Sequence, residues 1–226
     1  DSALKLFHGI RETLHQMQPD DVMGGTGDDD VQVGIQVLGG QLAGKVFRRK
    51  DLADELPSVD RELGLAVKAG TVRKAAQGLY YVPRRTPFGD VPPSEEALVE
   101  KFLDDHHFLM FNPSCYNALG LGTTQLYDKT VVYNHKRHGK FALAGFEFDF
   151  RDKPRFPSRK QVNREYLLVD MLNNLTDLAE DPETVLSNVR RKLDTFDEGR
   201  LEKMLADFGS ARTRRVFRQM KSAVHA

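Results

Sequence analysis

Two groups of side chains in this sequence have the types and spacing that metal chemistry uses. The first group combines the pair His106 and His107, the pair His135 and His138, and Asp105. Imidazole nitrogens and carboxylate oxygens are common zinc ligands. The second pair of histidines brackets two basic residues, however, and histidines in a basic loop are more often surface residues. We therefore predict no metal site and no cofactor.

The second group is a run of alternating charges. Glu147 and Asp149 lie on an expected strand, and Lys153 follows it. A metal-dependent nuclease needs two or three acidic ligands and a lysine that holds the attacking water, so Asp128 would have to supply the missing ligand. Charges that alternate along a half-buried strand explain the same pattern without catalysis. We predict that the protein is not an enzyme and keep a nuclease as a less favoured alternative.

Cys115 is the single cysteine of the chain. It rules out an intramolecular disulfide and fits a reducing cytosol, and we expect it to be a small buried apolar group. No apolar run approaches the roughly 20 residues that a membrane-spanning helix needs. The first six residues lack the basic and apolar regions of a signal peptide. We therefore expect a cytoplasmic protein with no membrane partner.

The charges of this 226-residue chain cancel in sum but are segregated along the sequence. Apolar residues make up 40% of it and charged residues 29%, which is enough to fill the core of one or two domains. Residues 44–89 carry ten basic and five acidic groups, whereas residues 1–43 carry two and seven. Because salt screens fields beyond about 8 Å, a polyanion responds to the local patch. Residues 44–89 are therefore the expected phosphate contact.

The same region has the order of elements of a winged helix-turn-helix. Helices are expected at 51–56 and at 59–67, where apolar residues recur at helical spacing and a glycine follows. Two short strands at 72–75 and 78–82 then surround a turn that contains glycine. The second helix has the right width for a DNA major groove, and the hairpin lies beside the groove.

Ten residues of this region are expected to contact DNA. Arg61 lies in the first turn of the second helix, where base edges are usually reached, and arginine favours guanine. Asp60 and Glu62 flank it and repel phosphate, so only part of this face can approach DNA. Ser58 is the expected N-cap. The full set is Arg48, Arg49, Lys50, Ser58, Arg61, Lys68, Arg73, Lys74, Arg84 and Arg85.

The segments around this unit set the expected first domain at residues 1–90. A helix is expected at 2–17, followed by a glycine- and aspartate-rich insertion at 22–44 that combines an acidic loop with a β-ribbon. Four prolines in residues 83–93 predict an extended linker and a domain boundary near residue 90.

Residues 91–226 are expected to form a second domain with a small sheet near its start and a helical C-terminal half. Its last helices are rich in arginine and lysine. A solvated helix face, an additional DNA contact and contact with an acidic partner protein all fit this basic tail. The expected elements are helices at 94–103 and 113–119, strands at 130–133, 141–143 and 146–150, and helices from residue 162 onward.

Several short motifs of the chain occur together in a recognisable order. They are Gln-Gly-Leu-Tyr-Tyr-Val-Pro at 77–83, Pro-Pro-Ser at 92–94, Ala-Leu-Gly-Leu at 118–121, and the strands Val-Val-Tyr at 131–133 and Phe-Glu-Phe-Asp-Phe at 146–150. Over about residues 46–157 the chain resembles the AbiEi-type antitoxins of bacterial type IV toxin–antitoxin systems. The insertion at 22–44 departs from the pattern of that family.

The resemblance implies a bacterial transcriptional repressor. In that family the winged helix binds the operator DNA of its own operon, and the second domain counteracts a nucleotidyltransferase toxin encoded alongside. The expected partners are double-stranded operator DNA, the cognate toxin and a second copy of the chain in a homodimer. The alternative is a protein-interaction module that neutralises a toxin with little DNA binding. The expected fold class is α+β, with an N-terminal winged helix-turn-helix followed by the second domain.

Overall fold

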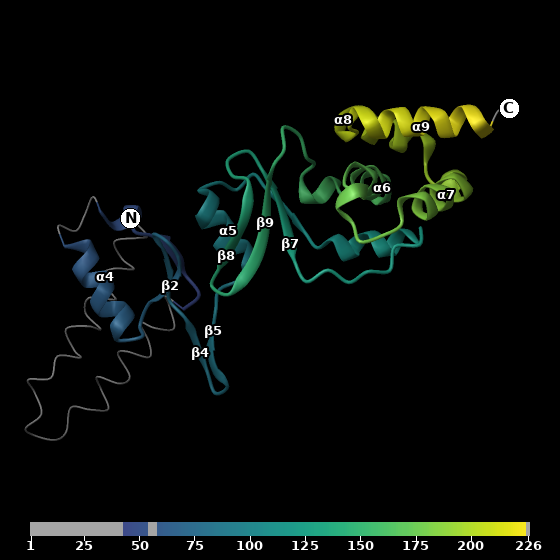
Figure 1. Ribbon diagram of the computed structural model, residues 1–226. Coiled ribbons are helices and arrows are strands. Elements are labelled where there is room, and N and C mark those ends of the chain that lie inside the picture. Colours follow the sequence, from purple (N-terminus) through teal and green to yellow (C-terminus); the bar gives the residue numbers. More distant parts are fainter. Residues whose placement is uncertain (1–42, 54–57, 225–226) are drawn as a thin grey trace, which may run out of the picture. The chain divides into compact units, whose positions relative to one another are not determined.

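The computed structural model describes residues 43–53 and 58–224. The expected N-terminal helix at 2–17 and nearly all of the insertion at 22–44 lie outside these residues. The described residues form an α+β protein whose strands build sheets of three, two and four strands (Figure 1). The predicted α+β class is thereby confirmed.

The described chain divides into two compact units. The first comprises the residues up to His106 together with Ala142–Glu147. The second comprises His107–Phe141 and the residues from Phe148 onward. The predicted boundary near residue 90 concerns domains that fold independently, and it stays a prediction.

The first unit contains a three-stranded antiparallel sheet. Its strands β1 (Val46–Arg48), β2 (Arg73–Ala76) and β3 (Leu79–Tyr81) lie in the order β1-β3-β2. Strands β2 and β3 form the hairpin expected from the sequence. Gly78 takes a φ of 71° in its turn, a conformation that glycine adopts without steric cost. The sequence did not predict β1, because three residues are too few to show a period.

Two helices pack on this sheet. They are α3 (Lys50–Ala53) and α4 (Val59–Lys68), and residues 54–56 of the first expected helix lie outside the described residues. Val59, Leu63 and Ala66 form the buried stripe of α4. Burying a valine or leucine side chain stabilises a fold by about 1.5–3 kcal/mol. The partners of this stripe in the core are Phe47, Leu52, Val72 and Val82.

A second hairpin follows where the sequence predicted an extended linker. Strands β4 (Arg84–Thr86) and β5 (Gly89–Val91) pair antiparallel, so that prediction was wrong. The prolines of this segment flank the strands or lie in the turn, where no ladder hydrogen bond needs their missing N–H groups. The Thr86 hydroxyl donates to the Gly89 carbonyl at 2.7 Å and accepts from the Phe88 N–H at 3.3 Å, which closes the turn.

Helix α5 (Glu95–Leu103) ends at a residue that binds two cations. Ser94 caps its start as predicted, because the Ser94 hydroxyl accepts from the Ala97 N–H at 3.3 Å. Asp104 follows its end in the left-handed region, with a φ of 54°. The Asp104 carboxylate lies 2.5 Å from the Arg48 guanidinium and 3.1 Å from the Lys50 ammonium. These hydrogen bonds lower the pKa of Asp104 to about 2 and join the end of α5 to β1 and α3.

The four-stranded sheet contains β6 (Leu109–Phe111), β7 (Thr130–Asn134), β8 (Gly139–Leu143) and β9 (Phe146–Asp152). The strand order is β6-β7-β9-β8. Strand β7 pairs antiparallel with β6 and parallel with β9. Its last four residues are all buried, as is typical of a strand covered on both faces.

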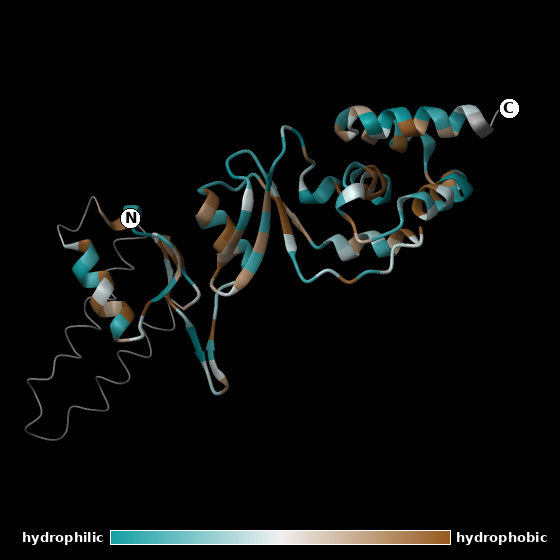
Figure 2. Cartoon of the chain, in the orientation of Figure 1, coloured by the Kyte–Doolittle hydropathy of each residue, from teal (hydrophilic) through white to brown (hydrophobic). Residues whose placement is uncertain are grey.

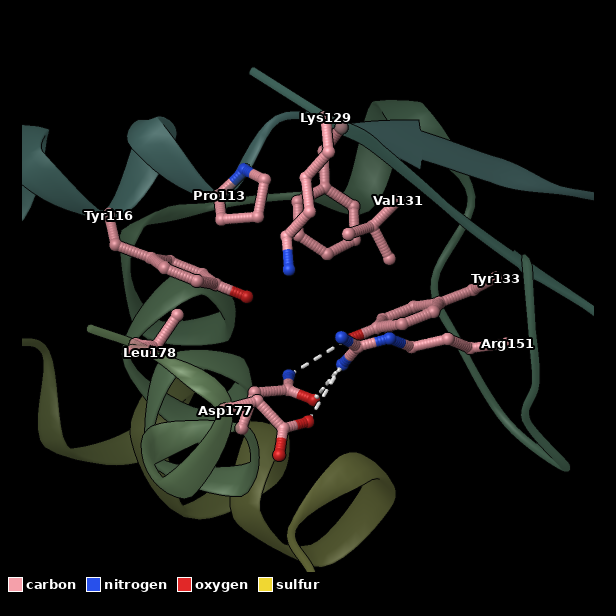
Figure 3. Close-up of a pocket in the computed structure, with 10 residues that line it drawn as sticks. Pro113, Tyr116, Lys129, Val131, Tyr133, Arg151, Asp177 and Leu178 are labelled. Atoms are coloured by element: carbon pink, nitrogen blue, oxygen red, sulfur yellow. Dashed lines mark hydrogen bonds and ion pairs between the residues drawn. The ribbon is translucent and has the colours of Figure 1, made fainter. Parts of the chain in front are cut away.

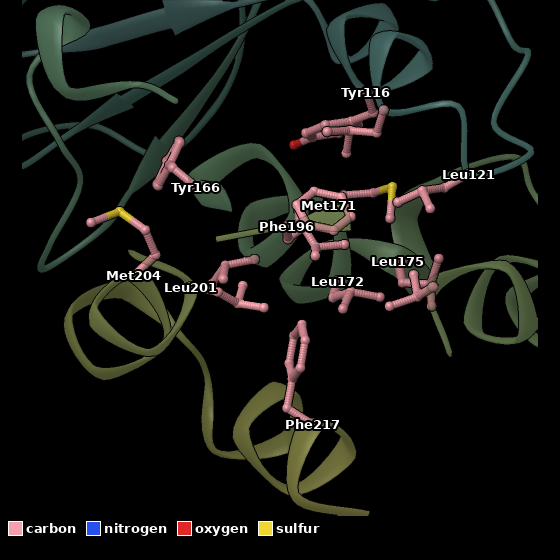
Figure 4. Packing of buried hydrophobic residues seen from close by; sticks show 14 of the residues in the cluster. Tyr116, Leu121, Tyr166, Met171, Leu172, Leu175, Phe196, Leu201, Met204 and Phe217 are labelled. Carbon is pink, nitrogen blue, oxygen red and sulfur yellow. The ribbon is translucent and has the colours of Figure 1, made fainter. Parts of the chain in front are cut away.

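Helix α6 (Arg164–Asn173) is the centre of the helical part of the second unit. Helices α8 (Glu198–Phe208) and α9 (Ala211–Val224) pack on it, and so does a 3₁₀ helix at Pro113–Leu119. Figure 4 shows side chains of the hydrophobic core that these helices share, and Figure 2 shows that α6 mixes apolar and hydrophilic residues, whereas α9 is mostly hydrophilic. Helix α7 (Pro182–Lys192) completes the set. None of the helices in the described ranges has the length and apolar content that crossing a bilayer requires.

We predict that Asp104→Asn lowers the urea midpoint of unfolding at neutral pH and has a much smaller effect near pH 2. The folded-state pKa of Asp104 is lowered from 3.8 to about 2, so its ion pairs stabilise the fold above pH 3.8 and are lost as the pH falls through 2. Asparagine also tolerates the left-handed backbone, so this substitution removes the charge without adding backbone strain. Asp128→Asn, at an exposed position, is the control. An equal effect of Asp104→Asn at both pH values would contradict the ion-pair explanation.

Candidate nucleic-acid interface

The outward face of α4 carries two cations that have no carboxylate partner among the described residues. Arg61 and Lys68 are exposed, and neither makes an ion pair with another described residue. Leu65 lies on the same side of the helix, with 47% of its surface exposed. Ser58 occupies the N-cap position, but its hydroxyl makes no capping hydrogen bond. The Ser58 side chain therefore does not cap the helix.

Four of the ten predicted contact residues are paired with carboxylates. Arg49 donates from Nε and Nη2 to the two Asp60 carboxylate oxygens, both at 2.6 Å. This contact lowers the pKa of Asp60 through the hydrogen bond from Arg49. Arg48 and Lys50 bind Asp104, as described above, and Arg73 binds Asp90 at 2.6 Å. Arg48 is also the least accessible, with 17% of its side chain exposed. These four cations add little to the local positive charge.

Strand geometry separates the two basic residues of β2. Lys74 lies opposite Tyr80, and Tyr80 lies opposite Phe47 and stacks on it with ring centres 6.0 Å apart. Phe47 belongs to the core beneath α4, so Lys74 faces the α4 side of the sheet. Adjacent residues of a strand point to opposite faces, and Arg73 therefore faces away from α4. The predicted pair does not share one face.

The remaining cations of the predicted set form no ion pair with a described carboxylate. The Lys74 ammonium donates to the neutral Gln77 amide oxygen at 2.9 Å. Arg84 and Arg85 are exposed on β4 and make no ion pair with another described residue. With Arg61 and Lys68 of α4, five cations of this unit are therefore open to a polyanion.

A buried polar cluster in the second unit was not anticipated. Asp170 of α6 is 3% exposed, and its carboxylate accepts hydrogen bonds from the Tyr116 hydroxyl at 2.7 Å and the Tyr133 hydroxyl at 3.0 Å. The Asn174 amide donates to the Tyr133 hydroxyl at 2.8 Å. Burial raises the pKa of Asp170, and the tyrosine hydrogen bonds oppose that rise. A charged residue in the apolar run 167–172 is the only sequence signal for this cluster.

A small cavity lies beside this cluster (Figure 3). Its lining includes Lys129, Arg151 and Asp177, and its volume is about 10 Å³. Arg151 donates to the Asn174 amide oxygen at 2.9 Å and to the Asp177 carboxylate at 3.3 Å. A cavity of about 10–15 Å³ is just large enough for one water molecule. The cluster therefore links the sheet to α6, and the cavity beside it has room for about one water molecule.

The residues considered for metal chemistry do not converge. The described residues contain no group of three histidine, cysteine or acidic side chains placed to hold a metal ion. Asp149 binds Arg151 at 2.8 Å, and the Lys153 ammonium lies over the Tyr133 ring, 4.7 Å from its centre. His106 approaches Glu100 at 3.2 Å. Within the described residues, the geometry does not assemble the nuclease set that was kept as the less favoured alternative.

Cys115 is half-buried against the core of the second unit. Burial is the main cause that raises its pKa to about 11. The thiol is therefore protonated at neutral pH, whereas a nucleophilic cysteine needs the thiolate. This position fits the packing role expected from the sequence.

The basic tail is partly used inside the fold. Lys221 binds Glu198 at 2.8 Å and Glu202 at 2.7 Å. Arg214 donates to the Leu205 carbonyl at 3.2 Å. Exposed arginines of the last helices that lack an ion pair with any described residue include Arg190, Arg191, Arg212, Arg215 and Arg218.

Comparisons with known proteins found no match. No family model matches the chain, and no curated protein or solved structure matches it. The resemblance to AbiEi-type antitoxins stays a prediction.

We predict that Tyr116→Phe lowers the free energy of unfolding by about 1–3 kcal/mol, because the buried Asp170 carboxylate loses a hydrogen-bond donor. Urea unfolding followed by circular dichroism measures the change. The control is Tyr80→Phe, which removes a hydroxyl that makes no hydrogen bond within the described residues. Equal effects of the two substitutions would contradict a special role for the cluster.

Proposed function

We propose that the chain is a DNA-binding transcriptional repressor whose first unit contains a winged helix-turn-helix. In this proposal α3 and α4 are the two helices, and α4 enters the major groove. The hairpin β2–β3 is the wing. The observation that carries the proposal is that Arg61 and Lys68, on the outward face of α4, are exposed and pair with no other described residue.

The order of elements supports this reading. A short helix precedes α4, and an antiparallel hairpin follows it directly. Because β1 pairs with β3, the hairpin is fixed to the sheet on which α4 packs. Lys74 on β2 faces the α4 side of the sheet, so it can reach a phosphate while α4 contacts base edges.

The distribution of charge supports a sequence-reading role for Arg61. It lies in the first turn of α4, and the neighbouring Asp60 is occupied by Arg49. That ion pair weakens the repulsion of phosphate that Asp60 would otherwise exert. We propose Arg61 as a base contact, and Lys68, Lys74, Arg84 and Arg85 as phosphate contacts.

The resemblance to AbiEi-type antitoxins extends the proposal to a biological role. The DNA would be the operator of the protein's own operon, and the second unit would counteract a nucleotidyltransferase toxin encoded alongside. A homodimer would match a palindromic operator. The exposed arginines of the basic tail that pair with no described residue favour the alternative in which protein interaction is the main activity, because they offer an acidic partner a complementary surface.

We predict that the protein prefers duplex DNA from upstream of its own gene to a shuffled duplex at about 0.15 M salt. Arg61→Ala should cost about 1–3 kcal/mol on the preferred duplex and leave binding to the shuffled duplex nearly unchanged. Fluorescence anisotropy with labelled duplexes measures both affinities. No preference in the unaltered protein would reject the repressor proposal.

Lys74→Ala should weaken binding to both duplexes alike and reduce the slope of log affinity against log salt by about one. The matched control is Lys160→Ala, an exposed lysine of the second unit. If Lys160→Ala changed the slope as much as Lys74→Ala, the wing would not be the contact.

The double variant Arg61→Ala with Lys74→Ala separates the two candidate functions. Co-expression of the full chain with the product of the neighbouring gene measures protection from toxicity. Protection retained without DNA binding supports a separate antitoxin activity of the second unit. Failure of the unaltered chain to protect rejects the antitoxin role while leaving DNA binding intact.

A further inference from the structure

An open groove in the second unit plays no part in the proposed DNA contact. It lies where β7 ends and α8 ends, and its volume is about 310 Å³. Small-molecule sites usually measure about 300–1,000 Å³ and combine aromatic walls with a few polar groups. The residues of the lining that matter here are His107, His135, Arg155, Phe156, Asp207 and Phe208.

The register of the sheet creates the aromatic part of this groove. Leu109 on β6 lies opposite Tyr133 on β7, so the antiparallel register continued by two residues places His107 opposite His135 on the same face. The two imidazole rings stack with centres 5.1 Å apart and planes at 12°. The Phe156 ring lies 4.8 Å from each of them. Both histidines are exposed, whereas Phe156 is 8% exposed.

Helix α8 supplies a further aromatic ring in a fixed position. The Phe208 ring packs edge-on against Tyr166, with centres 5.4 Å apart and planes at 86°. The Phe208 carbonyl accepts from the Asn173 side chain at 2.9 Å. These contacts hold the end of α8, so the groove is formed before any ligand arrives.

Two opposite charges in the lining are not used within the fold. Arg155 and Asp207 make no ion pair or hydrogen bond with another described residue. A guanidinium binds a phosphate through two parallel hydrogen bonds. A carboxylate accepts hydrogen bonds from hydroxyl or amino groups. The groove therefore offers ring stacking, phosphate recognition and a hydrogen-bond acceptor together.

We propose that this groove binds a nucleoside monophosphate, with the base stacked on the aromatic rings, the phosphate on Arg155 and a ribose hydroxyl or base amino group on Asp207. Stacking on aromatic side chains suits any base, because every base has a π face. The same chemical group occurs as a free nucleotide and as the 5′ end of a single strand of nucleic acid.

Isothermal titration of the full chain with AMP tests the proposal. Adenosine lacks the phosphate of AMP, and ribose 5-phosphate lacks the base. Both compounds should therefore bind more weakly than AMP. His135→Ala should weaken AMP binding roughly five- to 150-fold through lost stacking. Arg155→Ala should reduce the affinity for AMP to that for adenosine and leave adenosine unaffected.

Matched substitutions outside the groove provide the controls. His138→Ala and Arg190→Ala remove an exposed histidine and an exposed arginine and should leave AMP binding unchanged. A 5′-phosphorylated tetranucleotide that displaces AMP supports the proposal with a strand end as the ligand, and one that does not supports a free nucleotide. No binding of AMP at millimolar concentration overturns the proposal, as does binding that both groove variants leave unchanged. Arg61→Ala should not affect AMP binding, which keeps this result separate from the DNA-binding proposal.

Discussion

The packing of α4 on the three-stranded sheet is the constraint on which the first unit depends. Val59, Leu63 and Ala66 form one apolar stripe, and burying that stripe fixes the rotation of the helix about its axis. The rotation turns Arg61 and Lys68 outward. The buried stripe of α4 thus determines which charged side chains are exposed to a partner, although the stripe itself faces the core.

Charged side chains find different partners in the two units. In the first unit, carboxylates pair with four of the predicted contact cations, and the cations that pair with no described residue define the proposed DNA-binding face. In the second unit, Asp170 is buried, and tyrosine hydroxyls from other elements compensate its desolvation. Because removing one partner of a buried carboxylate is costly, this cluster ties α6 to the sheet.

The features that could be predicted from the sequence are the local ones. The spacing of α4, the cap of α5 at Ser94 and the hairpin β2–β3 follow from residues within a few positions of each other. The hairpin β4–β5 could not be predicted from a count of prolines, because the outcome depends on their placement outside the two strands. The partners of Asp170 lie 54 and 37 residues away, and the His107–His135 stack depends on strand register. Such contacts leave no local pattern in the sequence.

The most direct measurement is amide hydrogen exchange of the full chain, with and without duplex DNA from upstream of its gene. Contact of the first unit with DNA predicts slower exchange in α4 and in the hairpin β2–β3, with α6 unchanged. Slower exchange confined to the second unit, or none under conditions where the DNA is bound, would contradict the proposed interface.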